Sequence, residues 1–178
     1  LDRARAMAMV MLALPGAAFI YNGQELGLPN VELPDEVLQD PTWERSGHTE
    51  RGRDGSRVPI PWHGDTPPFG FSARTDTWLP MPPDWAALTV DKQLADAHST
   101  LSFFRRALEL RRSRTEFAGV EIEWLAAPRA ALIFRRGGLI CVLNAGRRPV
   151  ALPPGELLLA SAPLVDGELP PNAAAWLV

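Results

Sequence analysis

The sequence lacks several features that would point directly to a class of protein. Its 178 residues include one cysteine, Cys141, which excludes an internal disulfide framework. The 18 Lys and Arg are outnumbered by 21 Asp and Glu, and a net charge of −3 does not suit the phosphates of a nucleic acid. The three histidines are scattered without the spacing of a metal site. We therefore expect no nucleic-acid partner, no metal and no cofactor.

The sequence also has no long hydrophobic run. The longest apolar stretch covers residues 6–14, whereas a helix needs about 20 apolar residues to cross a bilayer, so we expect no membrane partner. With Arg3 and Arg5 ahead of it, this stretch could be a signal peptide. We favour a buried helix that ends at Pro15 and leads into a short apolar strand. Because a helix of this kind needs cover on all sides, residue 1 is not expected to be the natural start.

Prolines and tryptophans gather in the middle of the chain. Residues 29–90 contain more than half of the 18 prolines and four of the six tryptophans. A connection this long is typically functional or disordered, and its aromatic content favours an ordered loop. Residues 91–114 have the apolar spacing of a helix, with Ser99 as its expected N-cap. Its arginines are expected on a solvated face, namely Arg105, Arg106, Arg111, Arg112 and Arg114.

After Thr115 the apolar pattern changes to a period of two, which indicates strands. Two apolar runs flank Gly137 and Gly138, a two-residue signal for a β-hairpin. Further strands are expected near residues 148–152, 157–161 and 173–177. About six short strands in 60 residues predict an antiparallel all-β module.

Two stretches have a composition that suggests chemistry. Residues 19–29 begin as an apolar strand and end in polar residues, which is where α/β folds place functional groups, although Glu25 could equally be structural. Residues 52–62 alternate Arg and Asp in a loop rich in Gly and Pro. A guanidinium has five donors in a rigid fork, which can clamp a carboxylate or donate to sugar hydroxyls. From spacing alone, a functional loop and a purely structural clamp are equally supported.

These two stretches resemble a known family. Residues 21–28 read YNGQELGL and resemble the Y-Q-G-E-E-[IL]-G segment of the α-amylase superfamily, glycoside hydrolase family 13. Residues 52–62 read GRDGSRVPIPW and resemble the G-R-D-N-x-R-x-P motif of its α-glucosidases, oligo-1,6-glucosidases and trehalose synthases. Later matches follow in the family's order up to about residue 114. The chain departs from the family pattern at Asn22, Gln24 and Gly55.

The resemblance implies a fold and a domain division. Residues 1–114 are expected to form the C-terminal part of a (β/α)8 TIM barrel, with its last strand over residues 17–22 and its closing helix over 98–113. Residues 115–178 are expected to form an all-β antiparallel sandwich domain. The family's retaining mechanism uses a pair of carboxylates about 5 Å apart. In the family these carboxylates follow earlier strands of the barrel, so no catalytic residue is expected in this chain.

The resemblance also implies a function. The parent protein is expected to be a retaining α-glucosidase that hydrolyses terminal α-linked glucose from oligosaccharides, in the cytoplasm, and this chain is expected to be an inactive C-terminal fragment. Arg53 is the expected substrate-binding residue, while Asp54, Arg57 and Glu25 are expected to hold the loops in shape. Two alternatives remain: a trehalose synthase or other transglucosidase on the same fold, and a non-catalytic relative similar to the heavy chains of amino-acid transporters.

Overall fold

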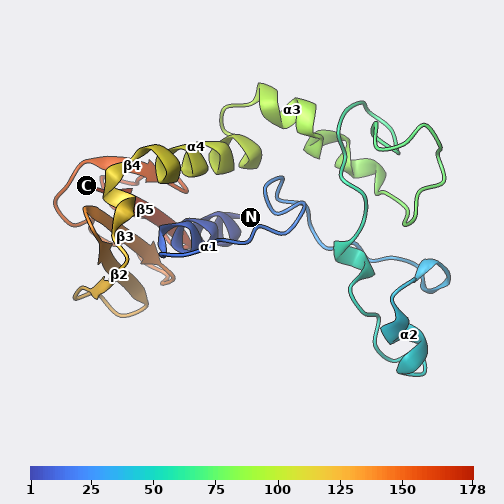
Figure 1. The fold of residues 1–178 in the computed structure, drawn as a ribbon, viewed down its shortest axis with the longest axis horizontal. Coiled ribbons are helices and arrows are strands. Elements are labelled where there is room, and N and C mark those ends of the chain that lie inside the picture. The colour runs from blue at the N-terminus through green and yellow to red at the C-terminus, as the bar shows by residue number, and fades with distance from the viewer. The chain divides into compact units, whose positions relative to one another are not determined.

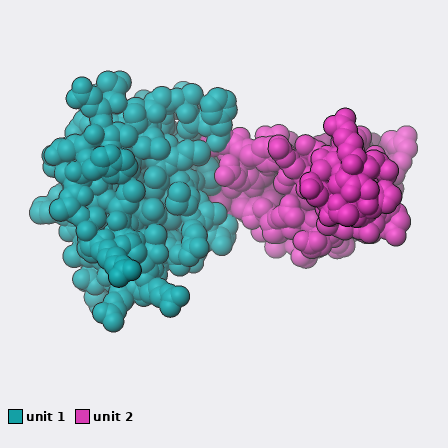
Figure 2. All heavy atoms as spheres, turned by 90° about the horizontal axis from the view of Figure 1, so that it is seen from below, with its two compact units in different colours: residues 1–19, 103–178 teal, residues 20–102 magenta.

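The computed structural model describes residues 1–178, which divide into two compact units (Figure 1 and Figure 2). Unit 1 combines residues 1–19 with residues 103–178, and unit 2 consists of residues 20–102. Unit 1 therefore includes the first helix of the chain, which the sequence analysis had grouped with the barrel.

Unit 1 contains one antiparallel sheet of five strands in the order β1-β2-β3-β5-β4. The predicted hairpin is confirmed: β2 pairs with β3 in register, and Gly137 adopts φ +56°, as a tight turn requires. The short β1 and β4 form the two edges of the sheet. The strands are β1 (Glu123–Trp124), β2 (Ala131–Arg136), β3 (Leu139–Asn144), β4 (Leu157–Ala160) and β5 (Ala173–Leu177).

The expected all-β antiparallel character is confirmed, but a two-sheet sandwich is not present. The strand predicted over residues 148–152 is reduced to an isolated bridge between Val150 and Leu169. Prolines explain this, because Pro149, Pro153 and Pro154 have no N–H to donate to a ladder. The segment therefore lies over the sheet without forming a second one.

The two faces of the sheet are covered differently. Ile133, Val142 and Ala175 lie on one face and pack with loop residues such as Leu169. On the other face, α1 (Asp2–Ala13) packs against β3 and β5. Alanines in α1 and β5 allow this close approach, because they add little bulk between a helix and a sheet.

The buried residues on the α1 side include an aromatic pair and the lone cysteine. Trp176 is fully buried and meets the ring of Phe117 edge-on at 4.9 Å between centroids. The Cys141 side chain, in the middle of β3, is also fully buried. Desolvation raises the pKa of its thiol to about 12, so the group behaves as a small hydrophobe rather than as a nucleophile.

Two arginines from distant parts of the chain cap the C-terminal end of α1. Arg136 of β2 donates to the carbonyls of Ala13 and Leu14 at 3.0 and 2.9 Å, and also to that of Gly119. Arg111 of α4 (Thr100–Ser113) donates to Leu12, Leu14 and Gly16. The expectation that Arg111 lies on a solvated face is thus wrong. The last turn of α1 contains no basic residue, so these two cations satisfy its free carbonyls and oppose the helix dipole.

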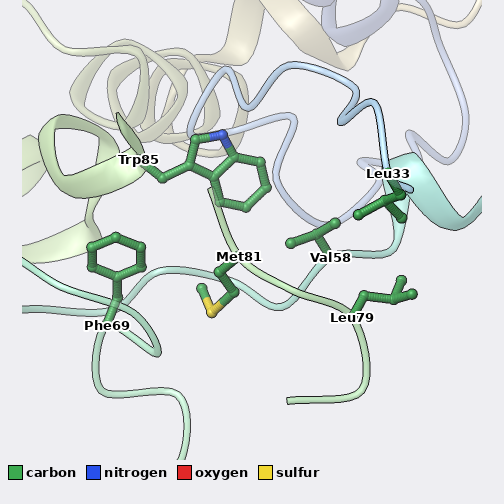
Figure 3. Packing of buried hydrophobic residues seen from close by; sticks show 6 residues of the cluster. All are labelled: Leu33, Val58, Phe69, Leu79, Met81 and Trp85. Atoms are coloured by element: carbon green, nitrogen blue, oxygen red, sulfur yellow. The ribbon is translucent and has the colours of Figure 1, made fainter. Parts of the chain in front are cut away.

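Unit 2 has little regular structure but a continuous apolar core, shown in Figure 3. Its helices are α2 (Pro41–Arg45) and α3 (Val90–Ala95), with short 3₁₀ segments at Asp35–Val37, Asp54–Ser56 and Pro83–Leu88. The core brings together side chains from across the long proline-rich stretch, which is ordered as predicted. Its buried members are Leu33, Val58, Phe69, Leu79, Met81 and Trp85.

The predicted last barrel strand over residues 17–22 is absent. These residues pair with no other strand, and the side chain of Phe19 is 86% exposed. An isolated apolar strand is not stable in water without neighbours that take up its backbone hydrogen bonds. The structure therefore shows no part of a barrel sheet.

Gln93 ties the start of α4 to the segment that follows residue 22. Its side-chain Nε2 donates to the backbone carbonyls of Leu26 and Leu88, and its side-chain Oε1 accepts from Leu101 N–H at 3.0 Å. Ser99 Oγ donates to Gln93 O and accepts from Ser102 N–H, so the predicted N-cap is confirmed. A single buried amide thus connects three separate stretches of unit 2.

The capping of α1 predicts that substitutions of two neighbouring arginines differ greatly in their effect on the stability of the protein. Arg136→Met removes the guanidinium and leaves the carbonyls of Ala13 and Gly119 without their side-chain donor, while Leu14 keeps the donor from Arg111. We expect a loss of about 2–3 kcal/mol in the free energy of unfolding. Chemical denaturation of the chain measures this directly. Arg135→Met is the matched control, because Arg135 is exposed and loses only a surface ion pair with Glu123, worth at most about 1 kcal/mol. Equal losses for the two variants would contradict the assigned role of Arg136.

Candidate functional site

The loop that contains residues 52–57 is organised around the buried carboxylate of Asp54. This residue is 1% exposed, and its Oδ2 accepts the backbone N–H groups of Gln39 and Asp40 at 2.5 and 2.7 Å. Its Oδ1 has no hydrogen-bond partner, and Arg57 Nη1 lies 3.8 Å away. The carboxylate therefore joins two segments of the chain that lie about 15 residues apart in sequence.

Asp40 is the second carboxylate of this network, and the sequence analysis did not identify it. Its Oδ1 accepts Thr42 N–H at 3.0 Å, so it caps α2. Its Oδ2 accepts Arg53 N–H at 3.0 Å and forms an ion pair with Arg57 Nη1 at 2.7 Å. Hydrogen bonds from Thr42 and Arg53, together with the charge of Arg57, hold the pKa of Asp40 far below its usual range. We name Asp40, Asp54 and Arg57 the carboxylate–arginine network.

A sequence signal for Asp40 does exist. Asp40 precedes Pro41, and Glu44 follows in the first turn, which is the pattern of a helix N-cap with Pro at the first helical position. That pattern predicts a cap but not the contact with residues 52–57. The contact requires glycine at residue 52. Its φ is +69°, and a Cβ atom at this position would lie only 2.5 Å from Asp40 Cγ. Only the folded loop brings these residues together.

Arg53 is held by its backbone and leaves its side chain exposed. Its N–H is bound by Asp40, and its carbonyl accepts the N–H and the hydroxyl of Ser56 at 3.0 and 2.9 Å. The guanidinium forms no hydrogen bond or ion pair anywhere in the chain. All five donors of Arg53 are thus presented from a backbone of fixed conformation.

Glu25 lies outside the carboxylate–arginine network. Its Oε2 accepts the N–H of Gly23 at 2.9 Å, and Gly23 adopts φ +93°. The neighbouring Gln24 Oε1 accepts Tyr21 N–H, also at 2.9 Å. Glu25 therefore stabilises its own turn, while the structure brings Arg53, Asp54 and Arg57 together in one loop.

A hollow of about 500 Å³ lies next to this loop within unit 2. Its walls combine Arg57 with three large aromatic side chains, of which Trp78 is 65% exposed, Tyr21 55% and Phe71 48%. Exposed aromatic rings beside a cation and hydroxyl groups can stack on the apolar face of a sugar ring and bind its hydroxyls. The remaining wall is formed by residues 56–60 and by Ile20 and Asn22.

No group of three or more His, Cys, Asp or Glu side chains is placed to hold a metal ion. His48 stacks on Trp43 with 4.8 Å between ring centroids and lies 3.2 Å from Glu44, so it belongs to a small surface cluster around α2.

No helix is both long and apolar enough to span a bilayer.

Most of the chain matches the model of a known protein family. Residues 1–118 match the family model of the α-amylase catalytic domain. The chain belongs to the α-amylase family. The matched residues include the carboxylate–arginine network, the hollow and both long helices. The match agrees with the family resemblance of the motifs at residues 21–28 and 52–62.

Two of the curated relatives of the chain are named as glucosidases. A probable α-glucosidase of Rhizobium meliloti is 36% identical over 145 residues, which are 79% of this chain and 26% of the relative. An oligo-1,6-glucosidase of Parageobacillus thermoglucosidasius is 26% identical over 129 residues, which are 62% of this chain and 23% of the relative. The chain thus spans about a quarter of the length of these relatives.

Solved structures of the α-amylase family share the fold of nearly the whole chain. An α-glucosyl transfer enzyme, XgtA, is 31% identical with a TM-score of 0.79, and the match covers 99% of this chain and 36% of that enzyme. The trehalulose synthase MutB of Pseudomonas mesoacidophila has a TM-score of 0.80 at 22% identity and shows likeness of fold alone. Its match covers 99% of this chain and 38% of the synthase.

The lowered pKa of Asp40 predicts how the loop responds to acid. Because the folded pKa lies below the unfolded value, the stabilisation by the ionised carboxylate is present above about pH 4 and is lost as the pH falls through the folded pKa. We expect the Thr42 amide resonance to titrate with a midpoint well below pH 4. The Asp40→Asn variant serves as the control and should lack this transition. A wild-type midpoint at or above pH 4 would contradict the network as described.

Proposed function

We propose that this chain is the C-terminal part of a retaining α-glucosidase that releases terminal α-linked glucose from oligosaccharides. The observation that carries the proposal is the exposed, unpaired guanidinium of Arg53 on a loop held by the carboxylate–arginine network. Glucosidases among the relatives within the α-amylase family support the same class of substrate. The reacting carboxylates of the retaining mechanism would be supplied by residues outside this chain.

Arg53 is proposed to bind the non-reducing glucose of the substrate. Its planar fork can form a bidentate pair with a carboxylate from another part of the intact protein, and the spare donors can hold a sugar hydroxyl. Asp54, Asp40 and Arg57 are proposed to keep the loop in shape. Glu25 is proposed to fix the turn at residues 21–25, from which Tyr21 contributes an aromatic wall to the hollow.

A second candidate is transfer of the glucosyl group to another sugar. The match with XgtA, an α-glucosyl transfer enzyme at 31% identity, favours this alternative. Hydrolysis and transfer share the binding of the terminal glucose and differ in the acceptor, which is water or a sugar hydroxyl. Product analysis of the intact protein with maltose distinguishes them, because transfer yields trisaccharides or isomeric disaccharides in place of glucose alone.

The role of Arg53 predicts a large kinetic effect in the intact protein. Arg53→Lys keeps the charge and loses the fork, so we expect kcat/KM for short α-glucosides to fall by about 10²-fold or more, roughly 2.7 kcal/mol of transition-state binding. Arg74→Lys is the control: this arginine is exposed and pairs with Asp76, and we expect unchanged kinetics. Wild-type kinetics of Arg53→Lys with a lower Tm would make Arg53 a scaffold residue.

The purified chain alone is expected to lack α-glucosidase activity. Without a nucleophile and an acid/base pair, the purified chain should release no p-nitrophenol from p-nitrophenyl α-glucoside above the rate of buffer. A spectrophotometric assay at high protein concentration measures this. Turnover that disappears on Asp54→Ala or Glu25→Ala, but persists in Arg74→Lys, would show that the chain contains its own reacting carboxylate.

A further inference from the structure

Unit 2 contains a second, smaller hollow that has a different chemical character from the first. Its volume is about 280 Å³, close to the lower end of small-ligand sites at about 300 Å³. It shares Tyr21, Asn22, Ser56 and Val58 with the larger hollow, so the two are neighbours. Its lining contains no Asp, Glu, Lys, Arg or His. We name it the neutral hollow.

Uncharged polar side chains line the neutral hollow, and three of them are carboxamides. Asn22, Gln24 and Asn30 contribute side-chain amides, and Ser56 contributes a hydroxyl. Gln24 Oε1 is occupied by Tyr21 N–H, whereas the exposed carboxamide of Asn30 forms no hydrogen bond with the chain. A carboxamide has two donors and one acceptor oxygen, which suits a ligand whose hydroxyls both donate and accept. The absence of charge disfavours an ionic ligand.

The position of Asn30 depends on the glycine at residue 55. A Cβ on Gly55 would lie 2.8 Å from both Nδ2 and Oδ1 of Asn30, and 2.4 Å from the carbonyl oxygen of Val31. The two segments are also joined by a hydrogen bond from Val31 N–H to Gly55 O of 2.9 Å. The φ of Gly55 is not in the left-handed region, so glycine is required here for space rather than for conformation. A side chain at residue 55 would displace the Asn30 amide.

We propose that Asn30, seated on Gly55, binds the second sugar residue of the substrate in the neutral hollow. The inference rests on the proposed function and extends it from the terminal glucose to its neighbour. Gly55 lies two residues after Arg53 in the loop held by the carboxylate–arginine network, and the proposal places the second ring along this loop when the terminal ring is bound by Arg53. A neutral wall of amides recognises a neutral, hydroxyl-rich ring and adds no charge near the reacting bond.

The test compares two kinds of substrate in the intact protein. Maltose and isomaltose have a second sugar ring, whereas p-nitrophenyl α-glucoside does not. For Asn30→Ala we expect KM for the disaccharides to rise about tenfold, as the loss of one or two hydrogen bonds predicts. We expect kcat/KM for the aryl glucoside to stay within about twofold. Asn30→Asp keeps the shape but loses both donors, and should change the disaccharide KM in the same direction.

Two further variants complete the experiment. Gly55→Ala should displace Asn30 and also raise the disaccharide KM, and its Tm is recorded because the Val31 carbonyl must move as well. Glu32→Ala is the control, since Glu32 is exposed, lies two residues from Asn30 and lines neither hollow. It should leave all constants unchanged.

The results separate this inference from the proposed function. Unchanged disaccharide KM values for Asn30→Ala and Asn30→Asp would overturn the inference while hydrolysis of α-glucosides stands. Equal losses on disaccharides and on the aryl glucoside would also overturn it, because Asn30 would then act on the loop rather than on the second ring. A protein that neither cleaves nor transfers from any α-glucoside would overturn both.

Discussion

The burial of the Asp54 carboxylate is the constraint on which the candidate site depends. A buried carboxylate is stable only when hydrogen bonds or charges compensate for its lost hydration. The backbone N–H groups of Gln39 and Asp40 provide that compensation, and in doing so they bind the 39–40 segment to the 52–57 loop. The 3₁₀ turn at Asp54–Ser56, the exposed Arg53 side chain and the contact of Asn30 with Gly55 all lie on or beside the loop that this anchor holds.

Unit 1 is stabilised by the same physical principle with opposite charges. At the end of α1, two guanidinium groups satisfy backbone carbonyls that the helix cannot pair by itself. Desolvation lowers the pKa of Arg136, and the nearby charge of Arg111 adds to this effect. In both units a charged side chain therefore holds the backbone at a point where regular secondary structure ends. This explains how a chain with so many prolines and so few strands still has defined loops.

Several elements could be predicted because their signals are local. The α1 helix, the β2–β3 hairpin and the Ser99 cap each depend on residues that lie within a few positions of one another. The burial of Cys141 follows from the apolar run around it. The strand expected over residues 17–22 shows the limit of such reasoning, because its apolar run describes a buried strand but cannot supply the neighbours that such a strand needs. The expected second sheet of a sandwich is missing for a related reason, because the prolines near residues 148–154 lack the backbone N–H groups that a β-ladder needs.

The order and spacing of the motifs were enough to predict the family, and they also placed Arg53, Asp54 and Arg57 in one loop. Three contacts became visible only in the folded chain: Asp40 completes this network, Arg111 and Arg136 cap α1, and Asn30 packs against Gly55. These contacts join residues 13 to 123 positions apart, and their energies depend on burial and direction, which no local pattern of residues encodes. A motif specifies which groups are present, whereas the packing of distant segments specifies which of them can meet.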